Sequence, residues 1–125
     1  MIAPNAVDLL VAARGTVLEA LLPSLPSELH YQCRMVANAL AIAVRELEFG
    51  EQVADLESHA LDHVLEPQGI PHLPHERALG ALVKLIRQGD FDRPGAGQAS
   101  LQQALTAITE ARLSVSNPKV LNHGR

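Results

Sequence analysis

The stretch RMVANALAIAVRELEFG, residues 34–50, decides the fold class of this chain. It is rich in Ala and Leu, which favour helices, and it ends at Gly50, a residue common just after a helix. Upstream, Ser27 is a good N-cap and Glu28 places a negative charge in the first turn. The pattern therefore predicts a helix from Ser27 to Gly50. Asn38, in the middle of the apolar run, needs an explanation.

Residues that typically start or end helices predict further helices along the rest of the chain. Asn5 followed by Asp8 is typical of a capped helix start, and LPSLP at 22–26 ends that helix. The further predicted helices cover Glu51 to Leu65, Pro74 to Gly89 and, after the loop GDFDRPGAG, Gln98 to Asn117. No alternating strand pattern competes with them. We expect an all-α, single-domain antiparallel helical bundle of about five helices over residues 1–125.

Composition and charge exclude several classes of function. The formal net charge is -4 without a run of like charge, and the aromatics are only Tyr31, Phe49 and Phe91. A nucleic-acid surface needs clustered cations or a stacking platform, so no nucleic-acid partner is expected. The longest uncharged apolar stretch is about half of the ~20 residues that a membrane span requires. With Cys33 as the only cysteine and no secretory signal pattern, a cytoplasmic location without membrane contact is expected.

The helix predicted over residues 27–50 has two faces that could make contacts. At about 100° per residue, one side collects apolar residues and is expected to face the core. This side carries Leu29, Val36, Leu40, Ala43 and Leu47. The opposite side carries Tyr31, Arg34, Asn38, Ile42, Arg45 and Phe49, with Met35 close by. A peripheral amphipathic helix has one apolar face, so this helix is expected to be central or at a subunit interface.

Three interpretations of Asn38 remain open. A buried carboxamide without a partner would cost about 1 to 3 kcal/mol, so Asn38 should be hydrogen bonded. It is either a structural pin between two helices, part of an anion or carboxylate pocket, or the centre of a homodimer seam. In the pocket interpretation, Tyr31, Arg34 and Arg45 join Asn38 as the lining.

The same stretch, together with ARLSVSNPKVL at 111–121, resembles a bacterial family of small helical domains of unknown function. The resemblance rests on the family motifs Arg-Val-Ala-x-Asn-x-Leu, Arg-Glu-Leu-Glu-x-Gly and a terminal Asn-Pro. The residues placed by these motifs are Asn38, Arg45, Glu46, Gly50, Asn117 and Pro118. Met35 stands where the family pattern has Val, and the histidine-rich centre departs from the pattern. Members of the family are associated with aminoglycoside-phosphotransferase-like and acyl-CoA-dehydrogenase-like proteins. The resemblance implies an accessory domain without its own activity.

The histidine-rich centre is the main candidate for metal chemistry. His59 and His63 lie one helical turn apart, and His72 and His75 follow with Asp62 and Glu66 nearby. Two imidazoles at this spacing can reach one metal, but the His-Glu-x-x-His order of a zinc peptidase is absent. The histidines are either solvated surface residues or a metal site built on His59 and His63.

Other motifs indicate no catalysis. Cys33 is expected to be an inert buried thiol, and there is no nucleophile elbow, phosphate loop or dinucleotide fingerprint. Gly15 indicates either a close helix approach or a tolerated weak position. We therefore expect a non-enzymatic, cofactor-free interaction domain that binds a partner protein or a second copy of itself, with a small anionic ligand as a further option. The binding or interface candidates are Tyr31, Arg34, Asn38, Arg45, Glu46 and Asn117.

Overall fold

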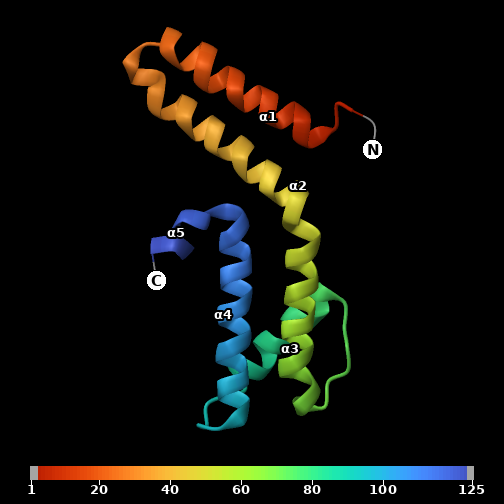
Figure 1. Cartoon of the computed structure of the whole chain (residues 1–125). Coiled ribbons are helices and arrows are strands. Elements are labelled where there is room, and N and C mark those ends of the chain that lie inside the picture. The colour runs from red at the N-terminus through yellow and green to blue at the C-terminus, as the bar shows by residue number, and fades with distance from the viewer. Residues whose placement is uncertain (1–2, 124–125) are drawn as a thin grey trace. The chain divides into compact units, whose positions relative to one another are not determined.

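The computed structural model describes residues 3–123, and these residues form helices and no strands. The helices are α1 (Ala6–Thr16), α2 (His30–Leu65), α3 (His75–Arg87), α4 (Ala96–Ser116) and α5 (Pro118–His123). Short turns of other helical types lie at Val17–Leu21, Leu22–Ser24, Ser27–Leu29 and Glu66–Gln68. The expected all-α fold is confirmed (Figure 1). None of the described helices is long and apolar enough to cross a membrane.

The number of helices agrees with expectation, but their boundaries differ. Gly50 does not end a helix, because α2 continues past it to Leu65. This helix of 36 residues replaces the two helices that were predicted over 27–65. One Gly costs only about 1 kcal/mol in a helix, which the flanking helix formers outweigh. Ser27 is not an N-cap: it begins a 3₁₀ turn that has Pro26 at the cap position and no side-chain cap bond. The predicted helix boundary at Asn117 is confirmed: α4 ends at Ser116, and Pro118 starts the short α5.

The chain divides into two compact units, which we describe separately. Unit 1 is the segment up to Glu51 together with Val115–Pro118, and unit 2 is Gln52–Ser114 together with the segment from Lys119. The number of folding domains, which we expect to be one, stays a prediction.

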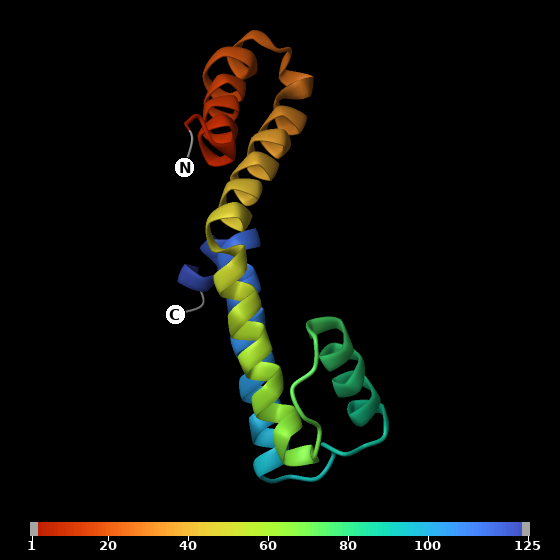
Figure 2. The ribbon, with the colours of Figure 1, turned by 90° about the vertical axis from the view of Figure 1, so that its right-hand side faces the viewer.

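In unit 1, α1 and the first part of α2 form a helical hairpin (Figures 1 and 2). The predicted start of α1 is confirmed: Asp8 N–H donates to Asn5 Oδ1 at 3.0 Å, and Asn5 N–H donates to Asp8 Oδ2 at 3.3 Å. Such a reciprocal box satisfies two backbone donors that the helix leaves free. Arg14 Nε then donates to the carbonyl oxygen of Ala37 at 3.2 Å and joins α1 to α2.

The buried side of α2 in unit 1 is not the predicted one. Cys33 and Ala37 are the buried residues between Tyr31 and Glu51, whereas Val36 and Leu47 are more than half exposed. The buried side lies next to the predicted one on the helix, and it carries the smaller side chains. Small residues let two helices approach closely, which explains how Arg14 reaches a backbone carbonyl of α2. The predicted core role of Leu29, Val36 and Leu47 is wrong.

Unit 2 contains a larger apolar core. Its most buried side chains are Leu61, Val64 and Leu65 of α2. These pack in one cluster with Ala78 and Leu82 of α3, Phe91 of the loop, and Ala104 and Ile108 of α4. Gly89, at φ +82°, makes the turn after α3 that leads to Phe91. Three helices and a loop therefore share the core of unit 2.

Candidate functional site

Four of the candidate interface residues, namely Tyr31, Arg34, Asn38 and Arg45, lie on the side of α2 that is turned away from α1. We call this the outer face of α2; it consists of Tyr31, Arg34, Met35, Asn38, Ile42, Arg45 and Phe49. On the helix, its centre lies about a third of a turn from Cys33 and Ala37, which face α1. Tyr31 is 72% exposed, and Met35 and Phe49 are also exposed. The structure therefore leaves large apolar side chains of this face uncovered.

Asn38 is exposed and is not the buried pin that one interpretation required. No hydrogen bond joins its side chain to another part of residues 3–123. Because an exposed carboxamide is hydrated, it needs no internal partner. The interpretations that remain are those in which Asn38 meets something outside the chain: a ligand, a partner or a second copy.

Arg45 has a structural bond that distinguishes it from Arg34. Its Nε donates to the carbonyl oxygen of Val115 at 2.6 Å, near the end of α4. The last carbonyls of a helix lack intrahelical partners, so a guanidinium there satisfies one of them. The bond also places the predicted residue Asn117, which is exposed, two residues along the chain from an Arg45 contact. Arg34 is exposed and remains available to a partner.

Glu46 folds back along its own helix. It is exposed, and its carboxylate lies so close to Gly50 that a Cβ built there would be 2.9 Å from Glu46 Oε1. A Cβ at Gly50 would therefore require only a shift of this exposed side chain, and Gly50 lies inside α2 and not at a helix end.

The buried polar group that holds helices together is Glu57 in unit 2, and the sequence analysis missed it. Glu57 is only 5% exposed, and its carboxylate accepts hydrogen bonds from two other elements. Arg112 of α4 donates to both oxygens, through Nε to Oε1 and through Nη2 to Oε2 at 3.1 Å. His75, the first residue of α3, donates through Nε2 to Oε2 at 2.6 Å. One carboxylate thus ties α2 to α3 and α4.

The electrostatics agree with an ionised carboxylate. Hydrogen bonding from the Arg112 guanidinium lowers the pKa of Glu57 below its usual value of 4.5, and the bond from His75 acts in the same direction. Burial acts in the opposite direction but is outweighed. The Glu57 carboxylate in turn raises the pKa of Arg112. The cluster serves as a polar structural pin of the kind that one interpretation assigned to Asn38.

A signal for this pin exists in the sequence. Glu57 lies four residues after Val53 and four before Leu61, on the apolar stripe of its helix. Arg112 lies four residues after Ile108 and three before Val115, on the stripe of α4. An isolated charge on each of two apolar stripes predicts that the two charges meet.

The histidines of unit 2 make separate contacts. His72 Nδ1 lies 2.9 Å from the carboxylate of Asp62, and His59 Nδ1 lies 2.8 Å from the carbonyl oxygen of Asp55. Within residues 3–123, no group of three or more His, Cys, Asp or Glu side chains is placed to hold a metal ion. His59 and His63 therefore have no third protein ligand in the described part of the chain. Cys33 is buried and its Sγ lies 3.6 Å from the carbonyl oxygen of Val17.

Residues 23–120 match the model of a domain of unknown function, DUF6285. The chain belongs to the DUF6285 family. The resemblance to a family of unknown function is thus confirmed. The matched DUF6285 region contains the outer face of α2 and the Glu57 cluster, whereas α1 precedes it. No curated protein and no solved structure matches the chain.

Proposed function

We propose that this DUF6285 protein is a non-enzymatic accessory domain that binds a partner protein through the outer face of α2. The observation that carries the proposal is the exposure of Tyr31, Met35 and Phe49 on a face that α1 leaves uncovered. Tyr, Phe, Met and Arg are the residues that protein interfaces use most, and Arg34 lies beside Tyr31 and Met35. The Tyr31 ring, the flexible Met35 thioether and the Arg34 guanidinium lie close together on the helix and can contact one partner surface.

The proposed partner is a phosphotransferase-like small-molecule kinase or an enzyme of an acyl-CoA pathway, as the family resemblance implies. The contact is centred on Tyr31, Arg34 and Asn38, because Arg45 is engaged with Val115. In protein interfaces, charges at the rim mainly affect the rate of association, whereas aromatic residues at the centre, here Tyr31, mainly affect the lifetime of the complex.

Binding of the full chain to candidate enzymes, measured by calorimetry, tests the proposal. A hot-spot residue contributes at least about 2 kcal/mol, so Tyr31→Ala should weaken binding by about 30-fold or more. Val11→Ala is the matched control, because Val11 is a large exposed apolar residue of α1 in the same unit. Equal affinities of the two variants would exclude the outer face of α2. Absence of binding to kinases and acyl-CoA enzymes alike would exclude the proposed partners.

Self-association is a second candidate function, favoured by the spacing of the outer face. Tyr31, Met35, Asn38, Ile42, Arg45 and Phe49 are separated by alternating steps of four and three residues, the repeat of a coiled-coil seam. An Asn within such a seam selects register and oligomeric state at a cost in stability. This proposal predicts a dimer in sedimentation that Met35→Ala weakens and Asn38→Leu strengthens. A monomer at every accessible concentration would contradict it.

A further inference from the structure

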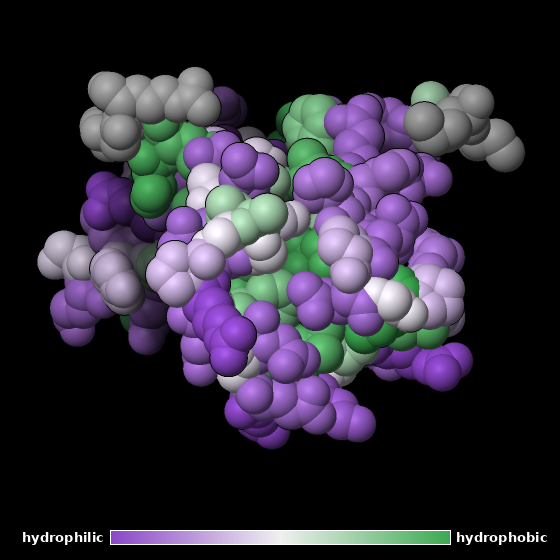
Figure 3. Space-filling view, turned by 90° about the horizontal axis from the view of Figure 1, so that it is seen from below, coloured by the Kyte–Doolittle hydropathy of each residue, from purple (hydrophilic) through white to green (hydrophobic). Residues whose placement is uncertain are grey.

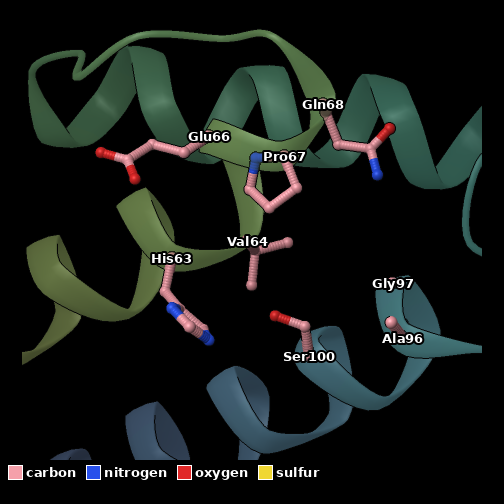
Figure 4. Close-up of a pocket in the computed structure, with 8 residues that line it drawn as sticks. All are labelled: His63, Val64, Glu66, Pro67, Gln68, Ala96, Gly97 and Ser100. Atoms are coloured by element: carbon pink, nitrogen blue, oxygen red, sulfur yellow. The ribbon is translucent and has the colours of Figure 1, made fainter.

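A cavity in unit 2 has the size and position of a small-molecule site. Its volume is about 610 Å³, within the range of roughly 300 to 1,000 Å³ usual for such sites. It lies between the end of α2, the Glu66–Gln68 turn and the first turn of α4 (Figure 4). Val64, Pro67 and Ala96 supply its apolar wall. In the view from below, hydrophobic side chains are visible between hydrophilic ones (Figure 3).

The first turn of α4 brings partial positive charge to this cavity. The first backbone bond at this end runs from Ala99 N–H to the carbonyl oxygen of Gly95, so the N–H groups of residues 96–98 precede the helix ladder. The helix has 21 residues and no acidic side chain in its first turn. The N-terminus of a long helix attracts anions through these donors and the helix dipole. Ala96 and Gly97, which carry two of the donors, line the cavity.

Ser100 provides an independent observation at the same place. Its hydroxyl oxygen is buried and has no hydrogen-bond partner, and no other buried side-chain nitrogen or oxygen of residues 3–123 is in this state. Leaving such a group unpaired costs about 1 to 3 kcal/mol. Figure 4 shows the hydroxyl directed from α4 toward the side of the cavity formed by Val64 and His63.

Glu66 and His63 are further polar residues of the cavity lining, near the first turn of α4. The Glu66 side chain extends away from Ser100 and Ala96, whereas the His63 ring lies near the Ser100 hydroxyl, on the side opposite Ala96 (Figure 4). Gly97 has no side chain, so its backbone is open to close approach. The donors of α4 and the Ser100 hydroxyl therefore lie on one side, and the only carboxylate of the lining points elsewhere.

We propose that this cavity binds a small molecule that carries one anionic group, a carboxylate or a phosphoryl group, on an apolar body. The anionic group accepts hydrogen bonds from the N–H groups in the first turn of α4 and from the Ser100 hydroxyl. The apolar body packs against Val64 and Pro67. The site lies wholly in unit 2 and does not depend on the function proposed for the outer face of α2.

Titration of the full, isotope-labelled chain with three matched compounds tests the proposal by NMR. Phenylacetate, benzylphosphonate and benzylamine share a benzyl group and differ in the charged group. The two anions should shift the amide signals of Gly97 and Gln98 saturably, and the stronger of the two identifies the preferred anion. Benzylamine should leave these signals unshifted. No saturable shift with either anion, or an equal shift with benzylamine, would overturn the proposal.

Two variants separate binding from folding. Gly97→Asp places a carboxylate at the helix N-terminus, where it favours the helix but competes with the ligand. A Cβ at Gly97 makes only ordinary contacts, at 3.8 Å from Gln68 Nε2 and 3.9 Å from Phe91 Cδ1, so this variant should fold. The Gly97→Asp variant should lose anion binding. Ala99→Asp is the control, because Ala99 is in the same turn but outside the cavity lining, and this variant should retain binding. Ser100→Ala should bind about 5-fold more weakly without a lower melting temperature; unchanged affinity in both Gly97→Asp and Ser100→Ala would contradict the site.

Discussion

Units 1 and 2 differ in the size of the side chains that they bury. Unit 2 buries Leu61, Leu65, Leu82, Phe91 and Ile108. In unit 1 the buried apolar residues of the described chain are Cys33, Ala37 and Val115, and α1 has no buried residue. Unit 1 instead exposes many of the larger apolar side chains, namely Leu9, Val11, Leu21, Leu29, Tyr31, Met35, Val36, Leu47 and Phe49.

This difference separates two uses of apolar surface. Burial stabilises a fold by about 25 cal/mol per Å², so the core of unit 2 is expected to supply most of the stability. Apolar surface that stays exposed in unit 1 remains available to a partner, since contiguous exposed apolar patches mark interaction sites. Unit 1 is also expected to unfold locally more often than unit 2, because a region with few buried contacts has low local stability.

The largest effect is expected from Leu61→Ala in the core of unit 2. Leu61 is fully buried, and removing a buried Leu side chain costs about 3 to 4 kcal/mol of unfolding free energy. Val36→Ala, in the same helix but in unit 1, should cost less than about 0.5 kcal/mol because the side chain is mainly exposed. Urea unfolding measures both. Similar losses for the two variants would show that unit 1 is packed as tightly as unit 2.

A smaller loss is expected when the charged pin of unit 2 is broken. Arg112→Ala leaves the buried Glu57 with His75 alone, and we expect a loss of about 2 kcal/mol. This is less than for a fully buried pair, because more than half of the Arg112 side chain is exposed. Replacing both partners, with Glu57→Met and Arg112→Met, should recover most of the loss, since no buried charge is then left. A double variant less stable than Arg112→Ala would contradict this account.

The same pin predicts how stability depends on pH. The pKa of Glu57 is lower in the folded chain than in the unfolded chain, so the unfolded chain binds more protons in acid. The contribution of Glu57 is fully present above its ordinary pKa of 4.5 and is lost as the pH falls below that value toward the folded pKa. Urea unfolding between neutral pH and pH of about 3 should show this loss. Glu57→Gln should be less stable at neutral pH and lose less in acid; an unchanged slope would exclude Glu57 as its source.

The smallest effect, and the only gain, is expected in α1 of unit 1. A Cβ at Gly15 would have no neighbour within 4 Å, so the glycine is not required for a close approach and the tolerated-position interpretation holds. Gly15→Ala should stabilise α1 by up to about 1 kcal/mol through helix propensity. Hydrogen exchange of α1 amides should slow, while exchange in the core of unit 2 should not change. Faster exchange in α1 would reveal a steric role for Gly15.

Local signals in the sequence predicted the helical class well. Composition, the Asn5 and Asp8 box and the Asn117 boundary each depend on a few neighbouring residues, and the structure confirms each. The prediction at Gly50 was wrong because an isolated Gly is a weak signal, whose cost a long helix can absorb.

The choice of buried face could not be made from one helix alone. Both sides of α2 in unit 1 carry apolar residues, and the approach of α1 selected the side with Cys33 and Ala37. Likewise, the candidate cavity depends on where α4 starts relative to the end of α2, which is a tertiary relation. The Glu57 and Arg112 pair was accessible to sequence analysis, because each charge interrupts an apolar stripe.

The position of Cys33 makes the hairpin of unit 1 measurable without a mutation. Cys33 is the only cysteine, it is buried, and its thiol lies against the carbonyl of Val17 just after α1. A thiol reagent can therefore react only when the hairpin opens, and the rate of labelling reports the population of the open form. A partner that clamps the hairpin would slow labelling, and one that displaces α1 would accelerate it. The rate of thiol labelling thus measures how often the hairpin of α1 and α2 opens.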